Sequence, residues 1–378
     1  MKKICIIGDF CYPSFAGGSS KHVYDIMTGF ARRGIETRLQ TRRKSDGNLY
    51  SADDADAETI YRRWVAEGRV KEFATGRIFN PFSYLKGIRG VDFVLIEHPV
   101  MGLFGAAAAR MAGKKTIYHY HGPIHLEYAA KTGRKGGVKY RLLWLMQKMT
   151  AALSHKILFH SEYMKGVAVR EHGVAPAKCA LLPPYIDPRD PADEPRLPCE
   201  IDPEKVNILI PRRLTARTGV VEFLTLFNEL SDELVGRFTV YVTGVGELEP
   251  QVRELASRNP GNVRYLGFVT YEQLWALYRR MTAVAVPTLD LEGFGYVILE
   301  ALSCGAGAIV STTCGGGYDF VRQNLGDDFC FDVSDKQSVR AAIEFIARRP
   351  KSPSDYRAVA ARFSTDAMLD TYIRDILK

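Results

Sequence analysis

Residues 287–305 have the sequence PTLDLEGFGYVILEALSCG. An apolar run ends at Pro287, a loop with two glycines follows, and the periodic segment from about Gly295 to Gly305 predicts a helix that Gly305 terminates. The start of such a helix presents free amides and the positive end of its dipole, and glycines let a ligand approach the backbone closely. The segment therefore predicts a phosphate-binding loop between a strand and a helix.

Two glutamates of this segment are candidates for ligand contacts. Glu292 lies in the loop and Glu300 in the predicted helix, and seven residues separate them. This spacing suits two contacts on one extended ligand better than a paired general acid and base. Taken singly, each glutamate favours a structural role, Glu292 near a helix terminus and Glu300 on a solvated helix face.

Short β-branched runs alternate with longer helical patterns on both sides of this segment. The predicted strands are residues 3–8, 93–97, 116–121, 156–160, 206–210, 239–243, 263–266 and 283–286. The predicted helices are residues 19–33, 102–112, 137–153, 220–230, 250–257, 271–280 and 295–305. Such alternation predicts parallel sheets covered by helices, hence an α/β fold with two Rossmann-like domains facing each other across a cleft.

A proline-rich segment predicts the boundary between the domains. Seven of the 18 prolines lie between Pro183 and Pro203, where proline density excludes helix and central strand. We therefore expect an N-terminal acceptor-binding domain over 1–186, a linker over 187–203 and a C-terminal nucleotide-sugar-binding domain over 204–363. The remaining residues, 364–378, form a predicted helix, and one interpretation has it crossing back to the N-terminal domain.

Composition excludes several classes of protein. Apolar residues make up 46% of the 378 residues and charged residues 25%, which excludes a disordered or fibrous chain. No apolar run approaches the roughly 18 residues of a membrane span, and the apolar stretch near the N-terminus is too short for a signal peptide. The seven cysteines are scattered without a C-x-x-C pair, so they predict reduced thiols in a cytoplasmic protein.

Charge is distributed unevenly along the chain. Residues 1–190 carry 30 Lys and Arg against 17 Asp and Glu, a balance of +13, whereas the remainder carries 21 against 26, a balance of −5. A basic half suggests an anionic partner, although the charge alone favours a solvated basic surface. Within it, the basic residues of 131–148 surround the apolar run 142–146, which predicts either an amphipathic helix on the inner face of a membrane or a core helix with a basic edge.

The segment 287–305 resembles the signature of the family-four (group 1) retaining glycosyltransferases of the GT-B fold. In that family, Glu, seven residues and Glu are followed by Ala and a turn of small residues. The resemblance implies that Glu292 contacts the donor sugar as a catalytic residue and that Glu300 contacts the ribose. It also implies that the nucleotide sugar lies along the intervening backbone, at Gly293, Phe294, Gly295 and Tyr296.

The resemblance extends over nearly the whole chain. Residues 12–18, YPSFAGG, resemble the family's N-terminal glycine loop, which implies that Gly17 and Gly18 approach the donor. Residues 242–248 and 262–269 resemble the family's strand-turn segments and imply that Phe268 and Val269 border the base. A plain glycine turn and core side chains are the alternative interpretations.

Residues 212–219, RRLTARTG, match the family's Arg-Leu and Lys-Gly segment that grips the donor diphosphate. The chain departs from the pattern because Thr218 stands at the lysine position. Arg213 is retained as a catalytic and donor-binding candidate, and Arg217 lies beside the substituted position. Since guanidinium groups bind phosphate bidentately, Arg213 and Arg217 together could replace one ammonium group.

Residues 118–123, YHYHGP, end a predicted strand, and the family resemblance favours His121 over His119 as the catalytic histidine at the donor sugar. The H-x-H pair also suggests a metal, but no third ligand stands at a recognisable spacing, so we predict no metal site here. Asp54 and Asp56 match an Asp-x-Asp metal motif formally; their place ahead of a helical pattern favours a helix-start role instead.

These observations predict a metal-independent, cofactor-free hexosyltransferase that moves a hexose from a nucleotide-diphosphate sugar, with a UDP-sugar favoured, to an acceptor hydroxyl. The acceptor would bind the basic N-terminal domain, and the product would be a glycan, glycolipid or glycosylated natural product. The alternatives are a non-catalytic nucleotide-sugar or polyanion-binding protein and a GT-B epimerase or phosphorylase. No nucleic-acid recognition motif occurs, so no nucleic-acid partner is expected.

Overall fold

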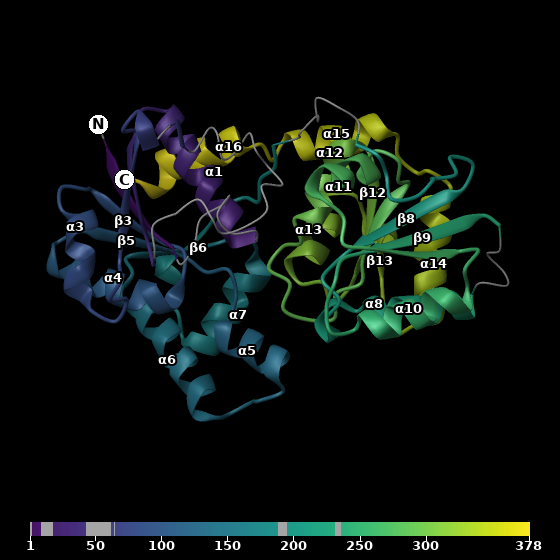
Figure 1. Ribbon diagram of the computed structural model, residues 1–378, viewed down its shortest axis with the longest axis horizontal. Helices are drawn as coiled ribbons and strands as arrows, with labels where there is room; N and C mark the ends of the chain where they lie inside the picture. The colour runs from purple at the N-terminus through teal and green to yellow at the C-terminus, as the bar shows by residue number, and fades with distance from the viewer. Residues whose placement is uncertain (1, 9–17, 43–61, 64, 188–194, 231–235) are drawn as a thin grey trace. The chain divides into compact units, whose positions relative to one another are not determined.

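The computed structural model describes every residue except 1, 9–17, 43–61, 64, 188–194 and 231–235. Its contacts divide the chain into unit 1, which comprises Met1–Pro183 and Thr365–Lys378, and unit 2, which comprises Pro184–Ser364. Each unit contains a parallel sheet with helices on both faces (Figure 1). The prediction of an α/β fold with two Rossmann-like domains is confirmed.

Among the described residues of unit 1, the sheet has seven strands in the order β3-β2-β1-β4-β5-β6-β7. The strands are β1 (Lys3–Ile7), β2 (Glu36–Thr41), β3 (Val70–Ala74), β4 (Phe93–Ile96), β5 (Lys115–His119), β6 (Lys156–Phe159) and β7 (Cys179–Leu181). The helices are α1 (Gly18–Arg32), α3 (Leu85–Ile88), α4 (Pro99–Met111), α5 (Ile124–Thr132), α6 (Val138–Leu153), α7 (Glu162–His172) and α16 (Thr365–Thr371). Short 3-10 turns lie at Pro81–Tyr84 and Pro176–Lys178, and a π-helix, η5, covers Tyr372–Ile376.

The sheet of unit 2 has six described strands in the order β10-β9-β8-β11-β12-β13. The strands are β8 (Val206–Pro211), β9 (Phe238–Thr243), β10 (Val263–Gly267), β11 (Ala283–Val286), β12 (Gly307–Ser311) and β13 (Cys330–Phe331). The helices are α8 (Val220–Glu229), α10 (Glu249–Arg258), α11 (Tyr271–Tyr278), α12 (Val297–Cys304), α13 (Gly316–Asn324), α14 (Lys336–Ala347) and α15 (Pro353–Ala361), with 3-10 turns η3 at Ala216–Thr218 and η4 at Asp327–Phe329. Helices α11, α12 and α15 lie on one face of the sheet, and α8, α10 and α14 on the other (Figure 1).

The central strands are buried along their whole length because both faces of each sheet are covered. Every residue of β4, β9 and β11 is buried. A strand of a parallel sheet has no solvent face, so its sequence is a continuous apolar run without polar alternation. This is why short runs such as 93–96 and 283–286 could be identified in the sequence.

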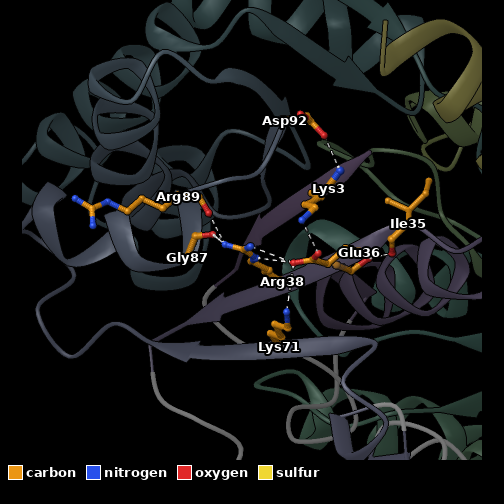
Figure 2. Close-up of polar contacts among 9 residues, drawn as sticks. Lys3, Ile35, Glu36, Arg38, Lys71, Gly87, Arg89 and Asp92 are labelled. Atoms are coloured by element: carbon orange, nitrogen blue, oxygen red, sulfur yellow. Dashed lines mark hydrogen bonds and ion pairs between the residues drawn. The ribbon is translucent and has the colours of Figure 1, made fainter. Parts of the chain in front are cut away.

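Charged residues at the start of β1, β2 and β3 are paired across the strands (Figure 2). The carboxylate of Glu36 lies 3.1 Å from Nζ of Lys3 and 3.5 Å from Nζ of Lys71. Arg38 also donates to Glu36 at 3.1 Å, and to the carbonyl oxygen of Gly87 at 3.2 Å. Because opposite charges on neighbouring strands attract one another, these strands can carry charged residues without a large loss of stability.

The C-terminal segment of the chain packs on unit 1. Arg33, after α1, contacts Asp366 and Asp370 at 3.0 Å each. The hydroxyl of Tyr372 lies 3.0 Å from Nε2 of His119, and Leu369 is completely buried. The last residues of the chain therefore complete the core of the first sheet.

Among the described residues, no helix is both long enough and apolar enough to cross a membrane. The described cysteines are free thiols.

Candidate functional site

The carboxyl ends of the parallel strands place the loops of unit 2 at one edge of its sheet. Loops follow β8 at Arg212, β9 at Gly244, β11 at Pro287 and β12 at Thr312. This is the edge at which open α/β sheets bind their ligands. The predicted phosphate-binding segment 287–305 belongs to it.

Two glycines lock these loops against one another. A Cβ on Gly219 would lie 1.9 Å from the carbonyl oxygen of Pro287, and a Cβ on Gly244 would lie 2.0 Å from that of Arg212. Both glycines have positive φ, +66° and +114°, which side-chain-bearing residues rarely adopt. The backbones after β8, β9 and β11 therefore touch, and any larger residue at these positions would push them apart.

Glu292 and Arg212 form an ion pair at this edge. Their side chains are only 14% and 10% exposed, and Arg212 also donates to the hydroxyl of Thr288 at 3.0 Å. Burial alone would lower the pKa of Arg212, but the Glu292 carboxylate outweighs it and the pKa is raised. The ion pair therefore holds the Glu292 side chain in one orientation.

Glu300 lies in α12, where its Oε2 accepts a hydrogen bond of 2.8 Å from the hydroxyl of Tyr278. Burial, and then the negative charge of Glu300, raise the pKa of Tyr278 well above its ordinary value, so the phenol remains a donor. Helix α12 ends at Gly305 in the left-handed conformation that the sequence predicts for that glycine.

The loop after β8 holds buried guanidinium donors. Nη1 of Arg217 and Nε of Arg212 are both buried and donate to no acceptor within the described part of the chain. Arg213, by contrast, is exposed. Thr218 is 2% exposed, and its hydroxyl lies 2.9 Å from the carbonyl oxygen of Arg213 and 2.7 Å from that of Thr215. Thr218, which stands at the family's lysine position, therefore stabilises the turn after β8 through these two hydrogen bonds.

The other predicted donor residues lie in different environments. Phe268 is 67% exposed, Val269 is half-buried and Phe294 is 4% exposed. Gly295 has a φ of +81°, and Tyr296 caps α12. Gly293 lies in the same loop. In unit 1, Gly18 begins α1, whereas Gly17 lies outside the described residues, as do Asp54 and Asp56.

The glycine run after β12 also contacts the loop after β11, and its role was not predicted from the sequence. The amide of Gly316 donates to the carbonyl oxygen of Glu292 at 3.2 Å, and a Cβ on Gly317 would lie 2.7 Å from the carbonyl oxygen of Phe294. Three consecutive glycines, 315–317, were the available signal, but no strand was predicted ahead of them. These glycines contact the backbone of the loop that carries Glu292.

In unit 1, the corresponding edge carries a group of histidines around one glutamate. Glu97 follows β4 and is 5% exposed; its Oε2 lies 3.0 Å from Nε2 of His121, and its Oε1 lies 2.7 Å from Nδ1 of His119. Nε2 of His22, from the first turn of α1, lies 2.8 Å from Nδ1 of His119. The His121 side chain is 28% exposed and that of His119 is 3% exposed, so His121 is the more accessible of the two.

Four of these side chains could surround a metal ion. The ligand atoms of His22, Glu97, His119 and His121 all lie within 4.8 Å of one another. The sequence analysis predicted no metal at the H-x-H pair because it found no third ligand. Residues 22 and 97 offer a third and a fourth possible ligand from other elements, which motif spacing does not reveal.

Comparison with known proteins places the chain among enzymes of sugar transfer. The model of the "Glycosyltransferase Family 4" domain matches residues 16–190, and that of "Glycosyl transferases group 1" matches residues 196–363. The O-antigen chain mannosyltransferase C of Escherichia coli is 27% identical over 96% of this chain and 94% of its own length. A D-inositol 3-phosphate glycosyltransferase of Kineococcus radiotolerans is 26% identical over 80% of this chain and 74% of its own length.

Solved structures share the fold over the full length of the chain. The sucrose-phosphate synthase of Thermosynechococcus elongatus has a TM-score of 0.74 at 16% identity and covers 100% of this chain and 99% of its own. Anabaena Alr3699/HepE in complex with UDP has a TM-score of 0.70 at 16% identity and covers 99% of both chains.

Proposed function

Because the chain belongs to the family-four, group 1 glycosyltransferases of the GT-B fold and transfers a sugar from a nucleotide sugar, we propose that the sugar is a hexose carried by UDP and transferred to a hydroxyl with retention of configuration. The diphosphate is bound at the carboxyl edge of the sheet of unit 2. No metal ion takes part in its binding.

The main support for the proposal comes from two buried donors, Nε of Arg212 and Nη1 of Arg217, which have no acceptor among the described residues. A buried N–H without an acceptor costs about 1–3 kcal/mol, and a diphosphate oxygen at this edge would supply the acceptor. Guanidinium groups and backbone amides stabilise the negative charge that develops on a leaving phosphate. Arg213, at the surface of the same loop, adds a further positive charge.

In the proposed reaction, one bond at the anomeric carbon of the sugar breaks and another forms. The bond to the diphosphate oxygen breaks while the bond to the acceptor oxygen forms on the same face, and the proton of the acceptor hydroxyl passes to the departing phosphate. Glu292 and His121 hold the sugar hydroxyls, and Glu300 binds the ribose. Phe268 and Val269 border the base.

The acceptor binds to unit 1, and helix α6 brings that unit to an anionic membrane. The exposed apolar residues Val138, Leu142, Leu145 and Met149 recur at intervals of three to four positions and form one stripe along α6. Lys139, Arg141 and Lys148 flank this stripe, and such a pattern is typical of helices that lie on anionic lipid surfaces. Because the proposed contact places unit 1 at a membrane, the proposed acceptor is a glycolipid or a polysaccharide built on a lipid carrier.

A panel of nucleoside diphosphates and nucleotide sugars, measured by thermal stabilisation, tests the donor. A ligand at 100 times its dissociation constant adds about 2.7 kcal/mol, so UDP and one UDP-hexose should raise Tm while other nucleotides do not. Stabilisation by GDP-mannose instead would contradict the uridine assignment. Donor consumption that requires an acceptor supports transfer, whereas conversion without one would indicate an epimerase.

A further inference from the structure

We propose that His22, Glu97, His119 and His121, the histidine–glutamate cluster of unit 1, bind one divalent transition-metal ion, with zinc as the best match. Three imidazole nitrogens and one carboxylate oxygen form a donor set that suits zinc. Calcium and magnesium prefer oxygen ligands, so they match this set poorly.

The contacts of His119 argue against a simple hydrogen-bonded cluster. Its Nδ1 lies 2.8 Å from Nε2 of His22 and 2.7 Å from Oε1 of Glu97. A neutral ring nitrogen has either one hydrogen or one lone pair in the ring plane, so it cannot serve both contacts. Oε1 of Glu97 is buried and accepts no hydrogen bond from the described residues. A cation bound between these side chains would accept lone pairs from the ring nitrogen of His119 and from the carboxylate of Glu97.

The spacing of the ligand atoms is close to that of a tetrahedral site. Zinc bonds to nitrogen and oxygen are about 2.0–2.2 Å long, which places tetrahedral ligand atoms about 3.3 Å apart. Nε2 of His22 lies 2.8 Å from Nδ1 of His119, and Oε2 of Glu97 lies 3.0 Å from Nε2 of His121 and 3.8 Å from Nε2 of His22. The other oxygen of Glu97, Oε1, lies 2.7 Å from Nδ1 of His119, and all four ligand atoms fit within 4.8 Å. Metal binding would therefore require the closest pairs to spread by roughly half an ångström and the widest pairs to draw together.

The far side of His119 has the partner that a metal-bound histidine needs. Its Nε2 lies 3.0 Å from the hydroxyl of Tyr372 in the C-terminal π-helix η5. Metal-ligating histidines usually use their second nitrogen for such a contact, which fixes the tautomer and the orientation of the ring. The C-terminal segment thereby supports the cluster from outside.

Metal uptake by the purified full-length chain tests the proposal. The chain is stripped with EDTA, titrated with Zn²⁺ against a chromogenic chelator, and compared with Glu97→Gln and Glu171→Gln. Glu171 is a matched control because it also contacts a buried histidine, His125, at 3.1 Å, but lies outside the cluster. We expect one zinc per chain in the wild type and in Glu171→Gln. Glu97→Gln should bind zinc at least 10- to 100-fold more weakly, the usual cost of losing even an outer-shell partner.

If Glu97→Gln fails to fold, the binding of Co²⁺ in place of zinc by the wild-type protein tests which residues are the ligands. The visible spectrum of tetrahedral Co²⁺ with nitrogen and oxygen ligands supports the cluster. A thiolate charge-transfer band would place the metal at a cysteine and overturn the proposal. Equal zinc affinity of wild type and folded Glu97→Gln, or no uptake by either, would overturn it as well.

A separate measurement rests on the proposed function. Nε2 of His121 cannot coordinate a metal and contact the donor sugar at once, so zinc should inhibit transfer and EDTA should relieve the inhibition. Zinc that binds without inhibiting leaves the metal site in place and contradicts only the catalytic role of His121.

Discussion

The guanidinium of Arg212 and the carboxylate of Glu292 form a nearly buried ion pair that joins the loops after β8 and β11 of unit 2. The pair fixes the carboxylate at the edge where the diphosphate is expected. Glu292 is thus positioned before any ligand arrives, which is the condition for stabilising charge without reorganisation.

Replacing Glu292 with glutamine should lower the turnover of sugar transfer by roughly 100-fold or more, because in the proposed function the lost charge faces the reacting sugar. Nucleoside diphosphate affinity, measured by calorimetry, should change little. Glu254→Gln on α10, also a glutamate of unit 2, is the control and should retain full turnover. Near-normal turnover of a folded Glu292→Gln variant would remove Glu292 from the mechanism.

Excess EDTA should not abolish transferase activity. In the proposed function, guanidinium groups and amides meet the charge of the diphosphate, and the proposed zinc site in unit 1 is not a diphosphate ligand. The assay is run with and without chelator at saturating donor. Complete loss of activity, restored by magnesium or manganese, would contradict metal-independent transfer.

The double substitution Leu142→Gln, Leu145→Gln should weaken binding to anionic vesicles by about tenfold or more, because two apolar side chains would no longer enter the bilayer. Both leucines are about half exposed, at 52% and 45%, so stability should hold. Met111→Gln, an exposed apolar residue outside the stripe, is the control. Binding that is unchanged, or equal on neutral and anionic vesicles, would refute the membrane contact.

The stability of the protein should fall as pH drops below about 6.5, in part because of His172. Burial lowers the pKa of His172 to about 4, and the nearby His125 and Lys148 act in the same direction. The unfolded chain therefore takes up a proton between pH 6.5 and 4 that the folded chain does not, which should cost on the order of 3 kcal/mol at pH 4.

Denaturant unfolding at pH 7 and pH 5 checks this effect. His172→Phe keeps an aromatic ring beside Tyr120 and Trp144 and should show a smaller loss of stability between the two pH values. An unchanged pH dependence in His172→Phe would assign the effect to other groups.

Much of the fold could be predicted because buried parallel strands have a distinctive sequence. The apolar runs that became β4, β9 and β11 have no solvent face. Strands β2 and β3 were not predicted, because Glu36, Arg38 and Lys71 interrupt them. Those charges are neutralised by one another across the strands, a pairing that exists only in three dimensions (Figure 2).

The candidate site could be predicted only where its residues are close in sequence. Segment 287–305 carries Glu292 and its glycines together, so its chemistry was apparent. Arg212 contacts Glu292 across 80 positions, whereas the family's Arg-Leu motif pointed to its neighbour Arg213, which precedes Leu214. Likewise, His22 and Glu97 join His119 only when α1, β4 and β5 are side by side.

Arg217→Ala should weaken binding of UDP by about one to two orders of magnitude, since a hydrogen bond to a charged group contributes about 1.5–3 kcal/mol. Nη1 of Arg217 is a buried donor without an acceptor in the described chain, and the diphosphate is its proposed partner. Uridine, which lacks phosphate, should bind equally to both proteins. Arg258→Ala, an exposed arginine of α10, is the control for loss of charge on unit 2.

The contacts of Thr218 should confine the effect of Arg217→Ala to the loss of the Arg217 side chain. The buried hydroxyl of Thr218 contacts the carbonyl oxygens of Arg213 and Thr215, so the turn should keep its shape when the neighbouring side chain is removed. If UDP binds Arg217→Ala as tightly as wild type in calorimetry, Arg217 is not a phosphate ligand. In that case Arg212 and Arg213 would have to hold the diphosphate without a group in place of the family's lysine.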